Sequence, residues 1–172
     1  MSKAVGALTT VVALGVFGGG AFAGWNMLTE PVDGGEKRPS CTMKHVAAGE
    51  PLTANLVQVD VFNASGREGL ANRASINLQR QGFLAGTIGN SESEIPVDHV
   101  AILTEEPESP LVELVAAQFQ VVPQIVAPDI PIGDGVTVVV GPNYTDVKPG
   151  APTEITAEAA ADVCVPDLTV GD

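Results

Sequence analysis

Basic and aromatic residues are scarce in this 172-residue chain. Lysine and arginine together number 8 against 21 aspartates and glutamates, which gives a formal net charge of −13. Proteins that bind nucleic acid or anionic lipid need clustered basic side chains, so this balance argues against both classes of partner. Aromatic residues make up only 4% of the chain, and we therefore expect a core built from aliphatic side chains.

The chain also has only two cysteines, too few for a small domain held together mainly by disulfides. Apolar residues nevertheless make up 45% of the chain, enough for a packed domain rather than a disordered one. The length suits one modest domain or at most two small ones. Composition thus bounds the fold but does not indicate an activity.

An uncharged run extends from Ala4 to Trp25 and follows a start that carries one basic residue, Lys3. As a tilted helix, this run is long enough to cross a hydrocarbon layer of about 30 Å. Ala21-Phe22-Ala23 resembles a signal-peptidase site, so secretion after cleavage behind Ala23 is the alternative to a single-pass anchor. The length of the run favours the first interpretation, in which residues 1–25 form an uncleaved transmembrane anchor. Either interpretation places the rest of the chain outside the cytoplasm.

The remaining chain divides into three segments. Residues 26–55 are interpreted as an extracytoplasmic linker, because prolines, glycines and a charged run punctuate them. Residues 56–147 alternate between strand and helix patterns and form the predicted domain. Residues 148–172 contain three further prolines and no periodic pattern, so we expect an extended tail.

Local patterns predict the elements of the domain. Alternating apolar and polar residues over 56–62 predict a strand, and apolar residues at helical spacing from Leu70 to Leu78 predict a helix. Gly82 is expected to end this helix in a left-handed cap, and Ser109-Pro110 is expected to start a second one. Further strands are expected over 83–89, 97–103, 121–126 and 136–140.

Two of these strands have predictable positions. Pro123 restricts the strand over 121–126 to a sheet edge, because proline lacks the N–H that a central strand needs. The strand over 136–140 is an unbroken apolar or β-branched run, which is typical of a central strand covered on both faces. The predicted order is β-α-β-β-α-(β)-β, an α/β (α+β) domain with two helices on a single small mixed sheet of 4–5 strands.

The turn that leads from the first strand into the first helix is the strongest candidate for a binding site. Free N–H groups at a helix start are able to hold an anion, and glycine lets a ligand approach the backbone. A capped strand-to-helix turn without any ligand explains the same residues, with the hydroxyl of Ser65 capping the helix. The candidate binding residues are Asn63, Ser65, Gly66, Arg67 and Gly69.

The two cysteines fall outside the predicted domain, Cys41 in the linker and Cys164 in the tail. Outside the cytoplasm such a pair most often forms a disulfide, so we predict a Cys41–Cys164 bond that staples linker to tail. A zinc site made with His45 and His99 is not expected, because only Cys41 and His45 have a suitable spacing.

No pattern in the sequence indicates catalysis. Phosphate-binding spacings such as G-x-G-x-x-G do not occur, and the acidic run Glu105, Glu106 and Glu108 is interpreted as a solvated helix start. We therefore expect no catalytic residue, no cofactor and no metal.

The stretch from Val57 to Asp146 resembles the LytR C-terminal domain family (LytR_C) of bacterial envelope proteins. The layout of one hydrophobic segment, a linker and one such domain is similar to small actinobacterial envelope-integrity proteins. The resembling segments are Val59-Asp60-Val61-Phe62-Asn63-Ala64-Ser65-Gly66, Gly69-Leu70-Ala71, Gln81-Gly82-Phe83 and Val136-Thr137-Val138-Val139-Val140-Gly141.

This resemblance implies a domain outside the cytoplasm, for which the family offers no established catalytic residues. Some members follow a LytR-CpsA-Psr domain, which attaches glycopolymers to peptidoglycan, and stand-alone members are thought to partner such enzymes. We therefore expect a membrane-tethered, non-enzymatic protein that supports the cell wall by binding a LytR-CpsA-Psr enzyme or a wall glycan. Charge repulsion disfavours phosphate-rich polymers. The alternatives are an enzyme acting on a phosphorylated envelope glycolipid at the 63–69 turn and a structural spacer.

Overall fold

The computed structural model describes residues 41–166. The predicted anchor or signal segment over 1–25 lies outside the described residues, as do the first part of the linker and the last residues of the tail. Among residues 41–166, no helix is long and apolar enough to cross a membrane.

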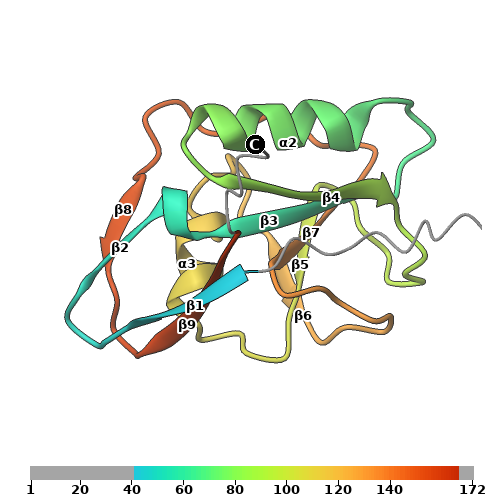
Figure 1. The fold of residues 1–172 in the computed structure, drawn as a ribbon. Helices are drawn as coiled ribbons and strands as arrows, with labels where there is room; N and C mark the ends of the chain where they lie inside the picture. Colours follow the sequence, from blue (N-terminus) through green and yellow to red (C-terminus); the bar gives the residue numbers. More distant parts are fainter. Residues whose placement is uncertain (1–40, 167–172) are drawn as a thin grey trace, which may run out of the picture. The chain divides into compact units, whose positions relative to one another are not determined.

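A five-stranded mixed sheet in the order β4-β3-β7-β5-β6 forms the centre of the domain (Figure 1). β3 is parallel to both β4 and β7, β5 is parallel to β6, and β5 is antiparallel to β7. Together with the two α-helices of the described residues, this sheet confirms the predicted fold class. The elements are β3 (Gln58–Asn63), α2 (Leu70–Arg80), β4 (Leu84–Asn90), β5 (Val100–Leu103), α3 (Pro110–Ala116), β6 (Gln124–Val126) and β7 (Val136–Val140).

Both faces of the sheet are covered. The middle strand β7 is buried at all five positions, as its apolar run predicted. On one face, aliphatic side chains of β3, β5 and β7 pack with α2 and α3. On the other face, Ile95, Ile130 and Ile132 from the flanking loops pack against a second cluster that includes Ala101, Leu103 and Val139. β6 is an edge strand, as Pro123 predicted.

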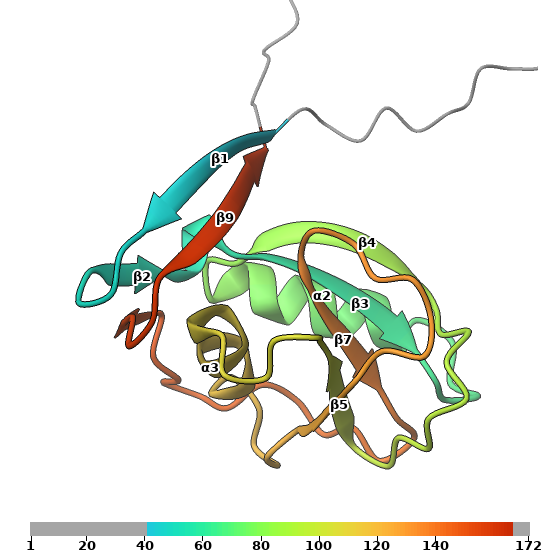
Figure 2. The same cartoon turned by 90° about the horizontal axis from the view of Figure 1, so that it is seen from below.

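The described parts of the predicted linker and tail contain paired strands. β1 (Cys41–Val46) is antiparallel to β9 (Ala161–Pro166), and β2 (Pro51–Thr53) is antiparallel to β8 (Glu154–Thr156). Figure 2 shows β1 and β9 side by side. A 3-10 turn, η1 (Ala54–Leu56), then leads into β3. The expectation of a linker over 26–55 and a patternless extended tail over 148–172 is thus corrected for 41–55 and 148–166.

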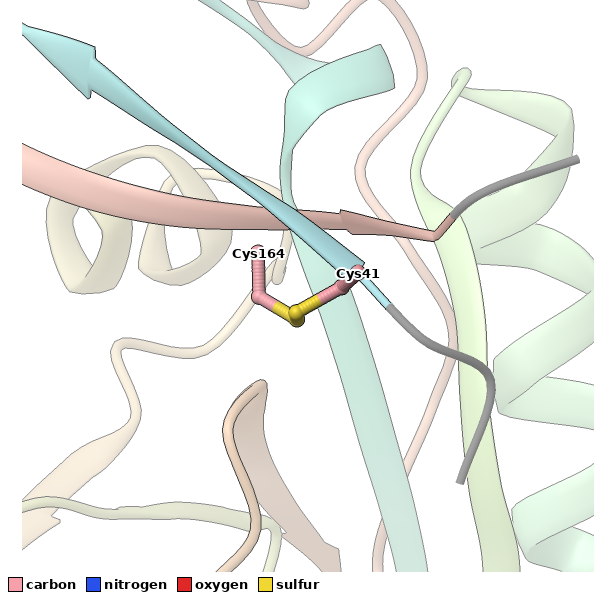
Figure 3. The surroundings of a disulfide bond; sticks show 2 residues. All are labelled: Cys41 and Cys164. Carbon is pink, nitrogen blue, oxygen red and sulfur yellow. A yellow bond between two sulfur atoms is a disulfide. The ribbon is translucent and has the colours of Figure 1, made fainter. Parts of the chain in front are cut away.

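The predicted disulfide between Cys41 and Cys164 is confirmed. It joins β1 to β9 across a sequence separation of 123 residues, with the two Cα atoms 5.3 Å apart (Figure 3). The same strand pair buries Val46 and Val163 in the main apolar cluster. Covalent and apolar contacts together therefore hold the two ends of the described chain against the domain.

The ends of the helices follow the sequence in part. Gly82 has a φ of 98° and begins the predicted left-handed cap of α2, in which the Phe83 N–H donates to the Leu78 carbonyl oxygen at 3.2 Å. Phe83 is buried as the hydrophobic contact of this cap. Ser109 and Pro110 begin α3 as expected, but the Ser109 side chain makes no capping hydrogen bond.

The edge strand β4 carries an irregularity opposite Asp60, where its register with β3 shifts. The buried Asp60 carboxylate accepts a hydrogen bond from the Thr87 N–H at 2.6 Å, so the ladder irregularity leaves no unpaired donor at Thr87. A Cβ on Gly86 would lie 2.8 Å from the Val59 carbonyl oxygen and would overlap the Asp60 carboxylate. Glycine at position 86 is therefore required for this close approach.

We predict that Gly86→Ala lowers the free energy of unfolding by about 2 kcal/mol or more, because backbone and a buried carboxylate must move apart. Gly66→Ala is the matched control, since a Cβ there meets no atom within 4 Å. Urea denaturation of both variants measures the difference. Equal stability of the two variants would contradict the packing described around Asp60.

Candidate functional site

The turn from Asn63 to Gly69 lies where β3 ends and α2 begins. It lines a shallow, open hollow together with Asn90 and Ser91, so the structure brings all five predicted binding residues to one place. Asn90 and Ser91 were not predicted. They lie at this hollow because β3 and β4 are parallel and end at the same side of the sheet, where the Ser91 N–H donates to the Asn63 carbonyl oxygen at 2.9 Å.

The buried side chain of Asn63 organises the turn. Its Oδ1 accepts hydrogen bonds from the Ser65 N–H at 3.0 Å and from the Ser65 hydroxyl at 2.7 Å. Its Nδ2 donates to the Arg67 carbonyl oxygen at 2.9 Å, and the Arg67 N–H donates to Ser65 Oγ at 3.1 Å. The polar side chains of Asn63 and Ser65 thus satisfy one another within the turn.

The start of α2 has no side-chain cap. Its N-cap residue is Gly69, which has a φ of 72° that glycine adopts without strain. The hypothesis that Ser65 caps the helix is therefore wrong: its hydroxyl caps the turn, and the helix begins only at Leu70. Within the described residues, no side chain caps this helix start.

The basic side chains around the turn are already engaged. Among residues 41–166, Arg67 is the one base that lines the hollow, and its Nη1 donates to the Pro142 carbonyl oxygen at 3.2 Å. On α2, Arg73 pairs with Asp146 at 2.7 Å, and Asn77 donates to the same carboxylate at 2.5 Å. Burial raises the pKa of Asp146, but the hydrogen bonds that its carboxylate accepts outweigh this effect and lower the pKa overall. These contacts fasten the segment after β7 to α2 and to the turn.

The two histidines have separate partners. His45 Nδ1 lies 2.8 Å from the Asp162 carboxylate, and His99 Nδ1 lies 2.8 Å from the Asn143 carbonyl oxygen. Across residues 41–166, no three histidine, cysteine, aspartate or glutamate side chains are grouped to hold a metal ion. Glu105 and Glu106 line a different hollow, near the start of α3.

Comparison with known proteins gives one family and one solved structure. The profile of the family LytR_C, described as LytR cell envelope-related transcriptional attenuator, matches residues 56–144, which include the turn and all five strands of the central sheet. A similar solved structure is the soluble domain of a conserved hypothetical secreted protein from Mycobacterium marinum. It is 20% identical, with 61% of this chain and 75% of that chain covered and a TM-score of 0.44. No curated protein matches the chain.

We predict that Asn63→Ala lowers the free energy of unfolding by about 2 to 3 kcal/mol, because it removes a buried amide and leaves its partners unpaired. Ser65→Ala should cost about 1 kcal/mol. Gly66→Val should change stability by less than about 0.5 kcal/mol, because a Cβ at this position meets no neighbour. Denaturant unfolding of the three variants measures this order. A loss of stability for Gly66→Val as large as that for Asn63→Ala would contradict it.

Proposed function

Because the chain belongs to the LytR_C family of cell envelope-related proteins, we propose that it is a membrane-tethered accessory protein of the bacterial envelope. In this proposal the module stands outside the cytoplasm and supports the cell wall without catalysing a reaction. The observation that carries the proposal is the Cys41–Cys164 bond, because structural disulfides persist in oxidising compartments outside the cytoplasm.

The partner is an envelope-assembly enzyme of the LytR-CpsA-Psr type, with a wall glycan as the second candidate. A net charge of −13 repels phosphate-rich wall polymers and leaves a protein or a neutral glycan as the favoured partner. The contact site is the hollow beside the 63–69 turn. Its openness and the uncapped start of α2 support this placement.

The hollow gives less support to the alternative of an enzyme for a phosphorylated glycolipid. Such an enzyme stabilises phosphate with several cations or with a metal held by acidic side chains. Arg67 and Glu68 are the charged residues that line this hollow, and the Arg67 guanidinium already donates to a carbonyl oxygen.

Capture from solubilised envelope tests this proposal, with the oxidised full chain as bait and mass spectrometry of bound proteins and glycans. We expect recovery of a LytR-CpsA-Psr enzyme by the native chain. We expect several-fold less with the double variant Ser65→Ala/Gly66→Val, which alters the rim of the hollow at a small cost in stability. Ser109→Ala is the control, because its hydroxyl caps nothing.

Each outcome of this capture has one meaning. Equal recovery by the native chain and the double variant would show that the contact site lies elsewhere than at the 63–69 turn. Recovery of glycan alone would identify a glycan-binding module. Recovery of neither would contradict the binding proposal and leave the spacer as the function.

A further inference from the structure

Exposed apolar side chains gather just before and within β6. Val121, Val122 and Ile125 are three of the six large apolar residues that lie exposed in the described chain, and the exposed fraction of Val122 is 86%. We call these three residues the apolar edge. Single exposed apolar side chains are common on proteins, whereas a group of them bordered by polar residues marks a surface for interaction.

The apolar edge lies on an open side of the central sheet. Within the described residues, β6 pairs with β5 only, so the other side of its backbone faces no strand. Such an edge accepts an added strand. The strand is only three residues long and follows Pro123, which limits backbone pairing to a few hydrogen bonds. Side-chain contacts and charge must therefore supply most of the affinity for an added segment.

Acidic residues predominate in the segment that supplies β5, β6 and their loops. No lysine or arginine lies between Arg80 and Lys148, the stretch that supplies β5, β6 and their loops. Asp98 lines the same hollow as Gln124, the first residue of β6. Glu105 follows Thr104, whose N–H donates to the Val126 carbonyl oxygen at 3.0 Å, so an acidic residue also follows the backbone contact at the other end of β6.

A third carboxylate lies in the loop after β6. Asp129 accepts a hydrogen bond from the Glu94 N–H at 2.8 Å, which brings the acidic loop before β5 to the loop after β6. Acidic residues thus come from three different segments around β6. The fitting partner is cationic, because opposite charge steers association and excludes acidic competitors.

The hollow at the start of β6 also adjoins the candidate site. The hollow of the 63–69 turn and the hollow that includes Asp98 and Gln124 share two lining residues, Ala64 and Ser91. The surface is therefore continuous from the turn, across the ends of β3 and β4, to the start of β6.

We propose that this surface docks an extended, positively charged polypeptide segment in which apolar side chains alternate with lysine or arginine. The apolar side chains cover Val121, Val122 and Ile125, while the cations pair with Asp98, Glu105 and Asp129. The inference rests on the proposed function in one respect: it gives the chemistry of the protein partner.

The test is fluorescence anisotropy of three labelled eight-residue peptides with the oxidised full chain. They alternate valine with lysine, valine with glutamate, or glycine with lysine. We expect the valine–lysine peptide to bind at least about tenfold more tightly than either control, and more weakly as salt rises. Equal binding of the glycine–lysine peptide would overturn the inference, since charge alone would then explain the affinity.

A pair of double variants locates the binding. The double variant Val122→Lys/Ile125→Lys should bind the valine–lysine peptide at least about tenfold more weakly than the native chain. The control variant Ile76→Lys/Ile88→Lys changes two other exposed residues and adds the same charge. Its affinity for the valine–lysine peptide should stay within about twofold of the native value. An equal loss in both variants would overturn the inference.

Amide chemical shifts of the native chain provide a check that needs no variant. Shifts that change along residues 94–106 and 121–129 as the valine–lysine peptide is added support the proposed surface, and shifts confined to α2 or β4 overturn it. A negative result in the peptide assay and a negative result in the envelope capture can be told apart. Capture of an enzyme without peptide binding would leave the proposed function intact and reject only this docking surface.

Discussion

The bond between Cys41 and Cys164 is the constraint on which the periphery of this structure depends. It closes a loop between two residues 123 apart in the sequence, and in the chain-entropy model such a loop removes about 5 kcal/mol of freedom from the unfolded state. That is comparable to the whole stability of many domains. The bond also keeps Val46 and Val163 against the apolar core, so β1 and β9 become part of the domain.

Inside this closure, an aliphatic chain poor in aromatic residues builds its core by covering both faces of one sheet. β7 is buried along its whole length, and β3 and β5 pair with it on either side. Because β3, β4 and β7 are parallel, their carboxyl ends meet at one side of the sheet. β5 is antiparallel to β7, so β5 and β6 begin at that side. The topology alone therefore places the 63–69 turn near the acidic loops and the apolar edge.

Features that depend on local chemistry could be predicted from the sequence. The apolar run of β7, the left-handed cap at Gly82 and the edge position that Pro123 imposes each follow from a few neighbouring residues. Pairings between distant segments could not, because β1 and β2 find their partners at the opposite end of the described chain. In the candidate site, the residues were predicted but the network was not. Asn63 lies buried at the centre of the turn, and Ser65 serves that turn instead of the helix.

The most direct test of the account is the redox state of the two cysteines in protein taken from its own cells. The cells are lysed in an alkylating reagent without reductant, and the digested chain is analysed by mass spectrometry. We predict one cross-linked peptide pair that contains Cys41 and Cys164, with both sulfurs unalkylated. Two alkylated thiols in the mature protein would contradict both the closure of the fold and the placement of the module outside the cytoplasm.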